Sequence, residues 1–182
     1  MKSRRFVFGL LLLALSACQL LPSDERQQEA GVWHAKLGLA YLKRGDRVLA
    51  RQHLVIALQE APRSAMVNAS MAYMMEQTGD VKTADVLYHK ALALAPGQSA
   101  YLHDYAAFLC RGRHYQRAMH YFALASRDAY YKHRALVYEN AGVCALAQGN
   151  KRLARYNFNK ALQNDPSRQR ALLELKNLSL RG

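Results

Sequence analysis

The chain has 182 residues, of which 51% are apolar, and a formal net charge of +13. This length is enough for one compact domain. Proline is scarce, with four residues, and strand-like alternation of apolar and polar residues is absent. Composition therefore argues against a β-rich domain and predicts an all-α protein.

The N-terminal residues have the pattern of an export signal. Lys2, Arg4 and Arg5 form a basic segment, and residues 6–15 form an apolar run that is too short to span a bilayer. The run ends in the sequence LSAC at 15–18, which resembles the lipobox of bacterial lipoproteins, in which the cysteine is acylated after cleavage. We therefore expect a lipoprotein signal peptide over residues 1–17 and lipidation of Cys18. The alternative is an ordinary signal peptide with an incidental cysteine.

The residues after Cys18 indicate where the mature protein resides. The residue after the cysteine is Gln19 and not an aspartate. By analogy with bacterial lipoprotein sorting, this predicts delivery to the outer membrane. The domain would then lie on the periplasmic face of that membrane. An acyl chain contributes about 0.8 kcal/mol for each buried CH₂, and more than one chain is needed for stable anchoring, a condition that a tri-acylated cysteine meets. Residues 18–30 are expected to form a short tether.

The charge balance bears on the kind of partner. The signal segment holds three of the 26 basic residues, so the remaining ones still outnumber the 13 acidic residues by ten. In the cytosol such an excess would suggest nucleic acid, but behind a lipobox no nucleic acid is expected. Anionic lipid headgroups, peptidoglycan or an acidic protein surface fit better, and a merely solvated basic exterior is the simplest alternative.

A pattern of three residue positions recurs four times along the chain. The positions are small, then large and apolar, then small, and successive copies are separated by 34, 34 and 36 residues. The first position holds Ala50, Ala84, Ala118 and Ala154; the second holds Leu54, Tyr88, Phe122 and Phe158; the third holds Ala57, Ala91, Ala125 and Ala161. A period near 34 in a helix–turn–helix pattern is the signature of tetratricopeptide (TPR) repeats, in which helical hairpins stack into a solenoid.

The sequence therefore predicts four repeats, at 31–64, 65–98, 99–134 and 135–168. A last helix, over 169–182, is expected to cap the final hairpin with Leu172, Leu175 and Leu178. The fold class is an all-α TPR solenoid of about four hairpins plus this capping helix.

The first helix of each repeat lines the concave side of a TPR stack, and positions 2, 5, 9 and 12 of the repeat are expected to face it. In repeats one and two these positions predict an apolar groove that suits an apolar or amphipathic peptide. The predicted groove residues are Val32, Ala35, Leu39, Leu42, Met66, Ala69 and Tyr73. The corresponding positions of repeats three and four hold Ala100, His103, Ala107, Cys110, Leu136, Glu139, Val143 and Leu146. The alternative is that curvature or the tether covers part of this row.

Cys110 and Cys144 lie in the first helices of repeats three and four, which are expected to be neighbours. A periplasmic location permits oxidation, and adjacent helices can bring the Cα atoms within the reach of a disulfide. We predict a Cys110–Cys144 disulfide, with two buried free thiols as the alternative.

No catalytic pattern is found. The seven histidines form no HExxH motif, and CxxC, GxSxG and phosphate-loop sequences are absent. The sequence thus predicts a scaffold, with no enzymatic activity, no cofactor and no metal.

Two segments resemble a known family. The sequence YAAFLC at 105–110 is followed by Gly112 and Arg113, and ENAGVC occurs at 139–144. Together with the lipobox, these resemble the type IV pilus biogenesis TPR lipoproteins, the pilotins of the PilF/PilW family. The resemblance implies an outer-membrane lipoprotein that helps to localise and assemble the secretin ring, and it implies that the early repeats bind the secretin subunit.

The family commonly carries about six repeats, whereas four are identified here, so only the contacts of the early repeats and the cysteine pair are carried over. The leading alternative is a TPR lipoprotein that acts as an adaptor for cell-wall hydrolases or outer-membrane assembly. A basic binder of nucleic acid or polysaccharide is a third class, and it would show steeply salt-dependent binding.

Overall fold

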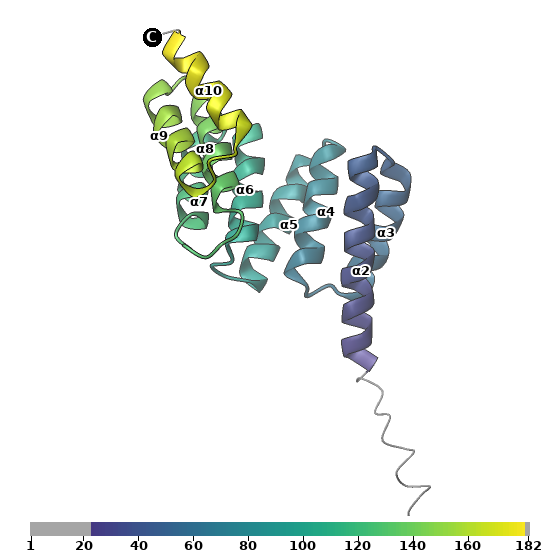
Figure 1. Cartoon of the computed structure of the whole chain (residues 1–182). Coiled ribbons are helices and arrows are strands. Elements are labelled where there is room, and N and C mark those ends of the chain that lie inside the picture. The colour runs from purple at the N-terminus through teal and green to yellow at the C-terminus, as the bar shows by residue number, and fades with distance from the viewer. Residues whose placement is uncertain (1–22, 181–182) are drawn as a thin grey trace, which may run out of the picture.

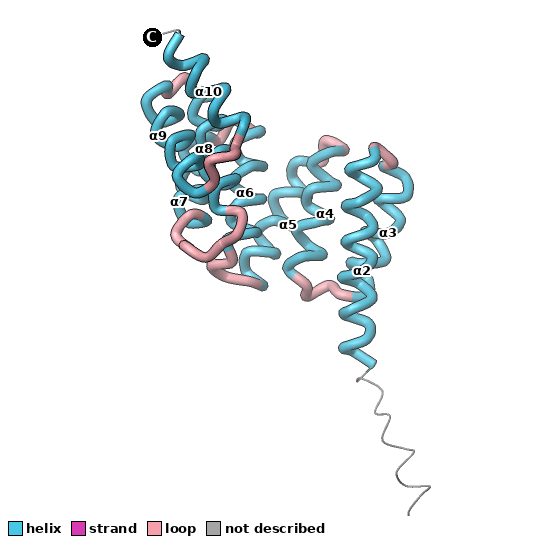
Figure 2. Tube along the Cα trace, viewed as in Figure 1, coloured by secondary structure: helices cyan, strands magenta, loops and turns pink. Residues whose placement is uncertain are grey.

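The computed structural model describes residues 23–180, which fold into nine α-helices and contain no strand (Figures 1 and 2). The helices are α2 (Ser23–Arg44), α3 (Arg47–Glu60), α4 (Ala65–Gln77), α5 (Val81–Leu94), α6 (Ser99–Arg111), α7 (Tyr115–Ala125), α8 (Arg134–Ala147), α9 (Lys151–Asn164) and α10 (Gln169–Leu180). None of these helices is both long and apolar enough to cross a bilayer.

The helices pair as four consecutive hairpins, α2–α3, α4–α5, α6–α7 and α8–α9, and α10 packs against α9 and α8. The first helices of successive hairpins contact one another, α2 with α4, α4 with α6 and α6 with α8. Figure 1 shows the hairpins in a row, with α2 and α10 at opposite ends. This is an all-α TPR solenoid, and the predicted fold class is confirmed.

The repeated small and large residues form the contacts within and between hairpins. The four alanines of the first column have no exposed surface, and the large residues of the second column are 0 to 2% exposed. Gly142 in α8 shows how close the helices come, because a Cβ atom there would lie 2.6 Å from Cε1 of Phe158. Burying each of these large side chains stabilises the fold by about 1.5–3 kcal/mol.

Three of the four hairpin turns use the same local chemistry. Gly45, Gly79 and Gly149 adopt positive φ angles of 84°, 85° and 84°. The next residue, an aspartate or asparagine, accepts a hydrogen bond from a backbone N–H three positions later, as Asp46 does from Leu49 at 3.0 Å. The glycine makes the turn without strain and the side chain caps the following helix.

The turn of the third hairpin differs. The positive φ, 61°, falls on Arg113 rather than on Gly112, and His114 makes no capping hydrogen bond through its side chain. A residue with a Cβ atom is disfavoured in this left-handed conformation.

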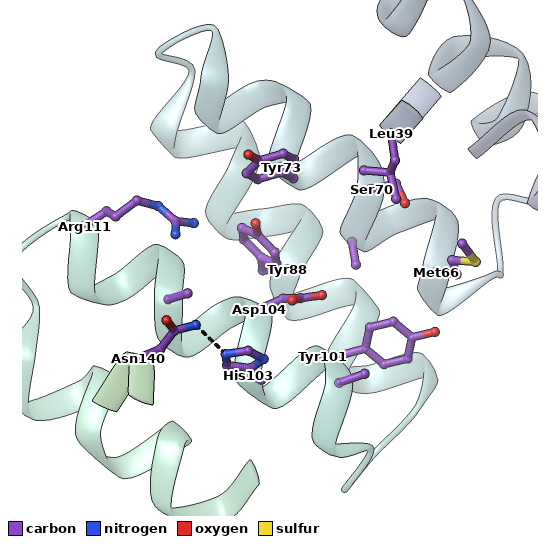
Figure 3. A pocket seen from close by; sticks show the side chains of 13 residues that line it. Leu39, Met66, Ser70, Tyr73, Tyr88, Tyr101, His103, Asp104, Arg111 and Asn140 are labelled. Carbon is purple, nitrogen blue, oxygen red and sulfur yellow. Dashed lines mark hydrogen bonds between the residues drawn. The ribbon is translucent and has the colours of Figure 1, made fainter. Parts of the chain in front are cut away.

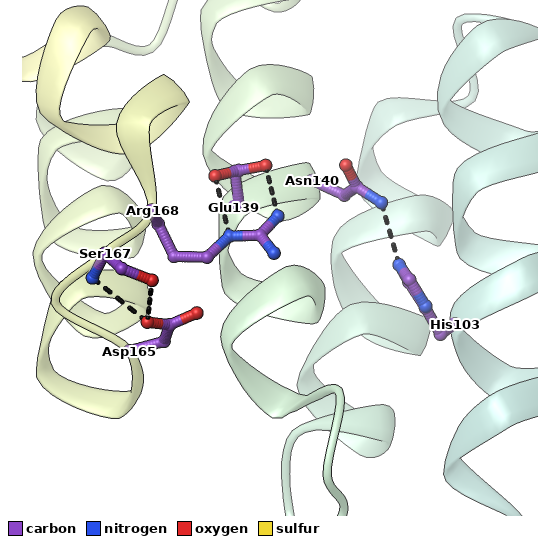
Figure 4. A network of polar contacts seen from close by, with 6 residues as sticks. All are labelled: His103, Glu139, Asn140, Asp165, Ser167 and Arg168. Atoms are coloured by element: carbon purple, nitrogen blue, oxygen red, sulfur yellow. Dashed lines mark hydrogen bonds and ion pairs between the residues drawn. The ribbon is translucent and has the colours of Figure 1, made fainter.

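The capping helix is anchored by an ion pair. Arg168, just before α10, donates hydrogen bonds from Nε and Nη2 to the two carboxylate oxygens of Glu139, at 3.0 and 2.6 Å (Figure 4). Glu139 is only 4% exposed. Removing Arg168 would leave the buried Glu139 carboxylate unpaired, which is costly, whereas the side chain of Arg168 is 26% exposed and would stay hydrated without Glu139.

Two sequence-based expectations need adjustment, and a third cannot be compared with the described residues. Residues from 23 onward belong to α2, so the predicted tether over 18–30 is too long; Asp24 and Glu25 in the first turn stabilise this earlier helix start. In α10 the buried residues are Ala171 and Leu178, whereas Leu172 is 51% exposed. Ala171 and Leu178 are seven residues apart and therefore lie on the same face of the helix. Leu172 is six residues from Leu178 and lies on a different face. The signal peptide and Cys18 lie outside the described residues.

Cys110 in α6 and Cys144 in α8 are joined by a disulfide, with Cα atoms 5.7 Å apart. The two residues are 34 positions apart in sequence, which is about the length of one repeat. The disulfide therefore links the first helices of repeats three and four, as predicted.

We expect Arg113→Gly to raise the free energy of unfolding by about 0.5–1 kcal/mol, because glycine relieves the left-handed strain but loses more entropy on folding. Chemical denaturation measures this. The reciprocal variant Gly79→Ala should lower stability by a similar amount. A neutral or destabilising Arg113→Gly would show that this turn is not strained.

Replacing both disulfide cysteines by serine should lower the free energy of unfolding by about 3–4 kcal/mol, from the loop-closure entropy of the unfolded chain. Denaturation of the variant and of the reduced parent should agree. A loss below about 1 kcal/mol in both would mean that the disulfide contributes little to the fold.

Candidate functional site

A groove of about 540 Å³ runs along the first helices of the hairpins. Its lining combines apolar and aromatic side chains with a few polar ones, from α2, α4, α5, α6 and α8 (Figure 3). The lining residues are Leu39, Met66, Ala69, Ser70, Tyr73, Tyr88, Ala100, Tyr101, His103, Asp104, Ala107, Arg111 and Asn140.

Four of the seven predicted groove residues, Leu39, Met66, Ala69 and Tyr73, line this groove together. The other three lie elsewhere. Ala35 is fully buried in the core of the first hairpins, and Leu42 packs against the same core. Val32 lines a separate shallow depression next to Trp33. The groove therefore starts further along α2 than the sequence pattern suggests.

The predicted row continues through repeat three and stops in repeat four. Ala100, His103 and Ala107 line the groove, whereas Cys110 is used in the disulfide. In repeat four Glu139 is bound by Arg168, and Val143 and Leu146 pack against the core cluster that includes residues of α10. The ion pair and the capping helix thus occupy the repeat-four positions that would face the groove.

Sequence reasoning missed several lining residues, and they share a position. Ser70, Asp104 and Asn140 each occupy the sixth position of their repeat, four residues after the expected second position. Residues four apart share a helix face. A groove-facing set made of repeat positions 2, 5, 6, 9 and 13 would therefore have included these three residues and also Arg111.

Arg111 at one end of the groove is paired. Its Nε and Nη2 atoms donate to the two carboxylate oxygens of Glu76, with 2.8 Å for the Nη2 bond. Tyr88 donates a hydrogen bond to the same carboxylate at 3.4 Å. The pair joins α6 to α4, and it neutralises the guanidinium charge.

His103 is a neutral, buried member of the groove floor. Asn140 Nδ2 donates to His103 Nε2 at 2.8 Å, which connects α8 to α6 (Figure 4). Burial lowers the pKa of His103 to about 4, helped by the charges of His133 and Arg111. The ring is therefore uncharged at pH 7.

Asp104 has a different environment. Among residues 23–180, no hydrogen bond or ion pair is made by its carboxylate. Solvent reaches the side chain, but the surrounding helices remove enough water to raise its pKa to about 6, although nearby Arg111 acts in the opposite direction. The groove thus contains one carboxylate without a partner.

The described residues contain no group of three His, Cys, Asp or Glu placed to hold a metal. The apolar walls, the polar floor and the open shape are suited to binding a protein segment.

We expect Asp104→Asn to raise the melting temperature at pH 7.5, by about 1–2 °C, since the exposure of the carboxylate limits the gain. The folded-state pKa of about 6 lies above the unfolded value near 3.9. The parent therefore binds a proton as the pH falls from 7 towards 4, and its disadvantage disappears there. His103 is present in both proteins, so its own pH dependence cancels in the difference. A gain that stays constant from pH 7.5 to 4 would contradict this assignment.

The chain is similar to proteins of type IV pilus assembly. It is 31% identical to the type IV pilus assembly protein PilF of Pseudomonas aeruginosa over 184 aligned residues, which cover 98% of this chain and 73% of the relative. In structure, it superposes on P. aeruginosa PilF with a TM-score of 0.79 and 32% identity, covering 85% of this chain and 70% of the other.

A second solved structure, that of PilW, described as a widely conserved type IV pilus biogenesis factor, has a TM-score of 0.75 at 23% identity and covers 82% of this chain and 69% of its own; it shows the same fold. No family model matches the chain. The identity to PilF, its coverage of both chains and the shared repeat architecture lead to one conclusion: this chain belongs to the PilF family of type IV pilus biogenesis TPR proteins.

Proposed function

We propose that this protein is a pilotin, an outer-membrane lipoprotein that binds secretin subunits of the type IV pilus machinery and promotes their localisation and multimerisation. The observation that carries the proposal is the groove, in which Leu39, Met66, Ala69 and Tyr73 of the first two repeats line the same cavity. Membership of a type IV pilus family makes a pilus component the first candidate for the partner.

The size of the groove bears on what it binds. About 540 Å³ accommodates several side chains of one segment rather than a folded domain. Tyr73 is 37% exposed, so it offers an aromatic surface that a bound segment can cover, and such side chains often dominate binding energy. We therefore expect a short amphipathic segment of the secretin subunit to occupy the groove.

The anchor belongs to the proposal as well. Acylation of Cys18 would hold the solenoid at the membrane, close to where the secretin ring inserts. The described structure begins a few residues later, at Ser23, so the helix would start near the lipid surface. Anchoring and binding then act together, because a tethered scaffold raises the local concentration of captured subunits.

We expect the double variant Leu39→Glu, Tyr73→Glu to abolish multimeric secretin in cells, because two charges would be buried against the bound segment. The measurement is the ratio of multimer to monomer in outer-membrane fractions, with loss of twitching motility as a second readout. The matched control is Val48→Glu, Val86→Glu, since these valines are 70% and 66% exposed and lie outside the groove.

Both double variants should have the same melting temperature as the parent. Normal multimers with a folded Leu39→Glu, Tyr73→Glu protein would reject the groove as the secretin site. A division or envelope defect with intact pili would instead support an adaptor for cell-wall hydrolases or outer-membrane assembly. Cys18→Ser should release the protein from the membrane fraction.

A further inference from the structure

Among the described residues, no hydrogen bond or ion pair engages the carboxylate of Asp104 in the groove. Figure 3 shows Asp104 extending from α6 into the middle of the groove, between Tyr88 and Tyr101. The other ionisable groups nearby are accounted for, because Arg111 is bound to Glu76 and His103 accepts a hydrogen bond from Asn140.

We propose that the segment bound in the groove carries a lysine or arginine side chain that pairs with Asp104, and that this ion pair selects the segment. The inference rests on the proposed function for the identity of the partner, the secretin subunit. It adds the chemistry of recognition, which the family resemblance does not supply.

A segment that covers the groove would change the surroundings of the Asp104 carboxylate. A purely apolar segment would remove the remaining water from the Asp104 carboxylate and leave the charge buried and unpaired, which is expensive. A segment with a cation avoids that cost and gains a charge-assisted hydrogen bond. The carboxylate therefore discriminates against apolar segments as well as favouring basic ones.

The surroundings of Asp104 also fit a long basic side chain. Met66 and Tyr101 line the same groove and offer apolar surface for the methylene groups of Lys or Arg, whose charged end would reach the carboxylate. The aromatic rings can add a cation–π contribution.

Arg111, the one Lys or Arg side chain that lines the groove, is already bound to Glu76. Lys36 occupies the equivalent sixth position of repeat one, but its Nζ lies 5.5 Å above the ring of Trp33, outside the groove lining. The chain as a whole is positively charged and therefore repels basic segments. The preference for a cation is a local property of the groove.

The ionisable groups that face Asp104 determine how peptide binding should depend on pH. Arg111 and Glu76 form a pair whose charges cancel, and the tyrosines have pKa values that burial raises, so they stay neutral below pH 9. These tyrosines are Tyr88, Tyr101 and Tyr131. Of Asp104 and His103 in the groove lining, Asp104 is thus the one whose charge changes between pH 7.5 and 5, because the pKa of His103 lies near 4. His133, which acts electrostatically on His103, lies outside the lining and is unchanged in Asp104→Asn, so its effect cancels between the two proteins.

The test uses the purified lipidated protein in detergent and fluorescent 20-residue peptides that tile the mature secretin subunit of the same organism. Each peptide that binds is also made with its lysines and arginines replaced by glutamine. We expect Asp104→Asn to weaken the basic peptide about tenfold and to abolish its advantage over the glutamine version. The affinity of the parent should fall about three- to tenfold from pH 7.5 to 5, whereas that of Asp104→Asn should not.

Asp128→Asn is the matched control. Asp128 accepts a hydrogen bond from the Tyr130 backbone in an exposed loop, and asparagine keeps that bond while removing the same charge. Charge reversal is a second test, in which Asp104→Lys should recover binding to a peptide whose critical basic residue is replaced by glutamate.

The outcomes separate this inference from the proposed function. If Asp104→Asn binds the basic peptide as the parent does, while Leu39→Glu, Tyr73→Glu loses it, the ion pair is rejected and the pilotin proposal stands. If neither peptides nor intact secretin bind the parent, both are rejected. Binding confined to peptides without Lys or Arg also overturns the ion pair.

Discussion

The close approach of helices at the alanine columns is the constraint on which the rest of the structure depends. With Ala50, Ala84, Ala118 and Ala154 fully buried, the two helices of each hairpin can pack tightly, and the large residue of the second column fills the space between them. This fixes the first helices side by side and so creates one continuous concave wall. The groove, the Cys110–Cys144 disulfide and the Glu139–Arg168 pair all lie between first helices or cap their end.

The polar residues in and beside the groove fall into two groups, those that hold the helices together and one that is available to a partner. Glu76 with Arg111, and His103 with Asn140, are satisfied pairs that tie neighbouring hairpins together. Among the described residues Asp104 has no such partner, and partial loss of water raises the pKa of its carboxyl, which disfavours the charged form. A local cost of this kind is common where a site is built for a ligand, and it separates the residue that would recognise a partner from those that hold the solenoid.

Much of the fold could be predicted from the sequence because the repeat makes each position visible four times. The buried columns and the pairing of helices into hairpins follow from that periodicity, and the disulfide follows from the placing of two cysteines on neighbouring first helices. The groove was less predictable. Ala35 and Leu42 have the right composition for a binding wall, but tertiary packing buries them in the core, and α10 with Arg168 closes repeat four. Asp104 is adjacent in sequence to His103, a residue in the predicted row, yet only the structure shows that its carboxylate has no partner among residues 23–180.

The central claim is that the groove holds a segment of the secretin subunit, and site-specific photo-crosslinking in living cells tests it most directly. A photoreactive phenylalanine analogue is placed at Tyr73 in the groove, or at Val86, which is 66% exposed and outside it. The account predicts a covalent adduct with the secretin subunit from position 73 and none from position 86. No secretin adduct from position 73, or equal adducts from both positions, would contradict it.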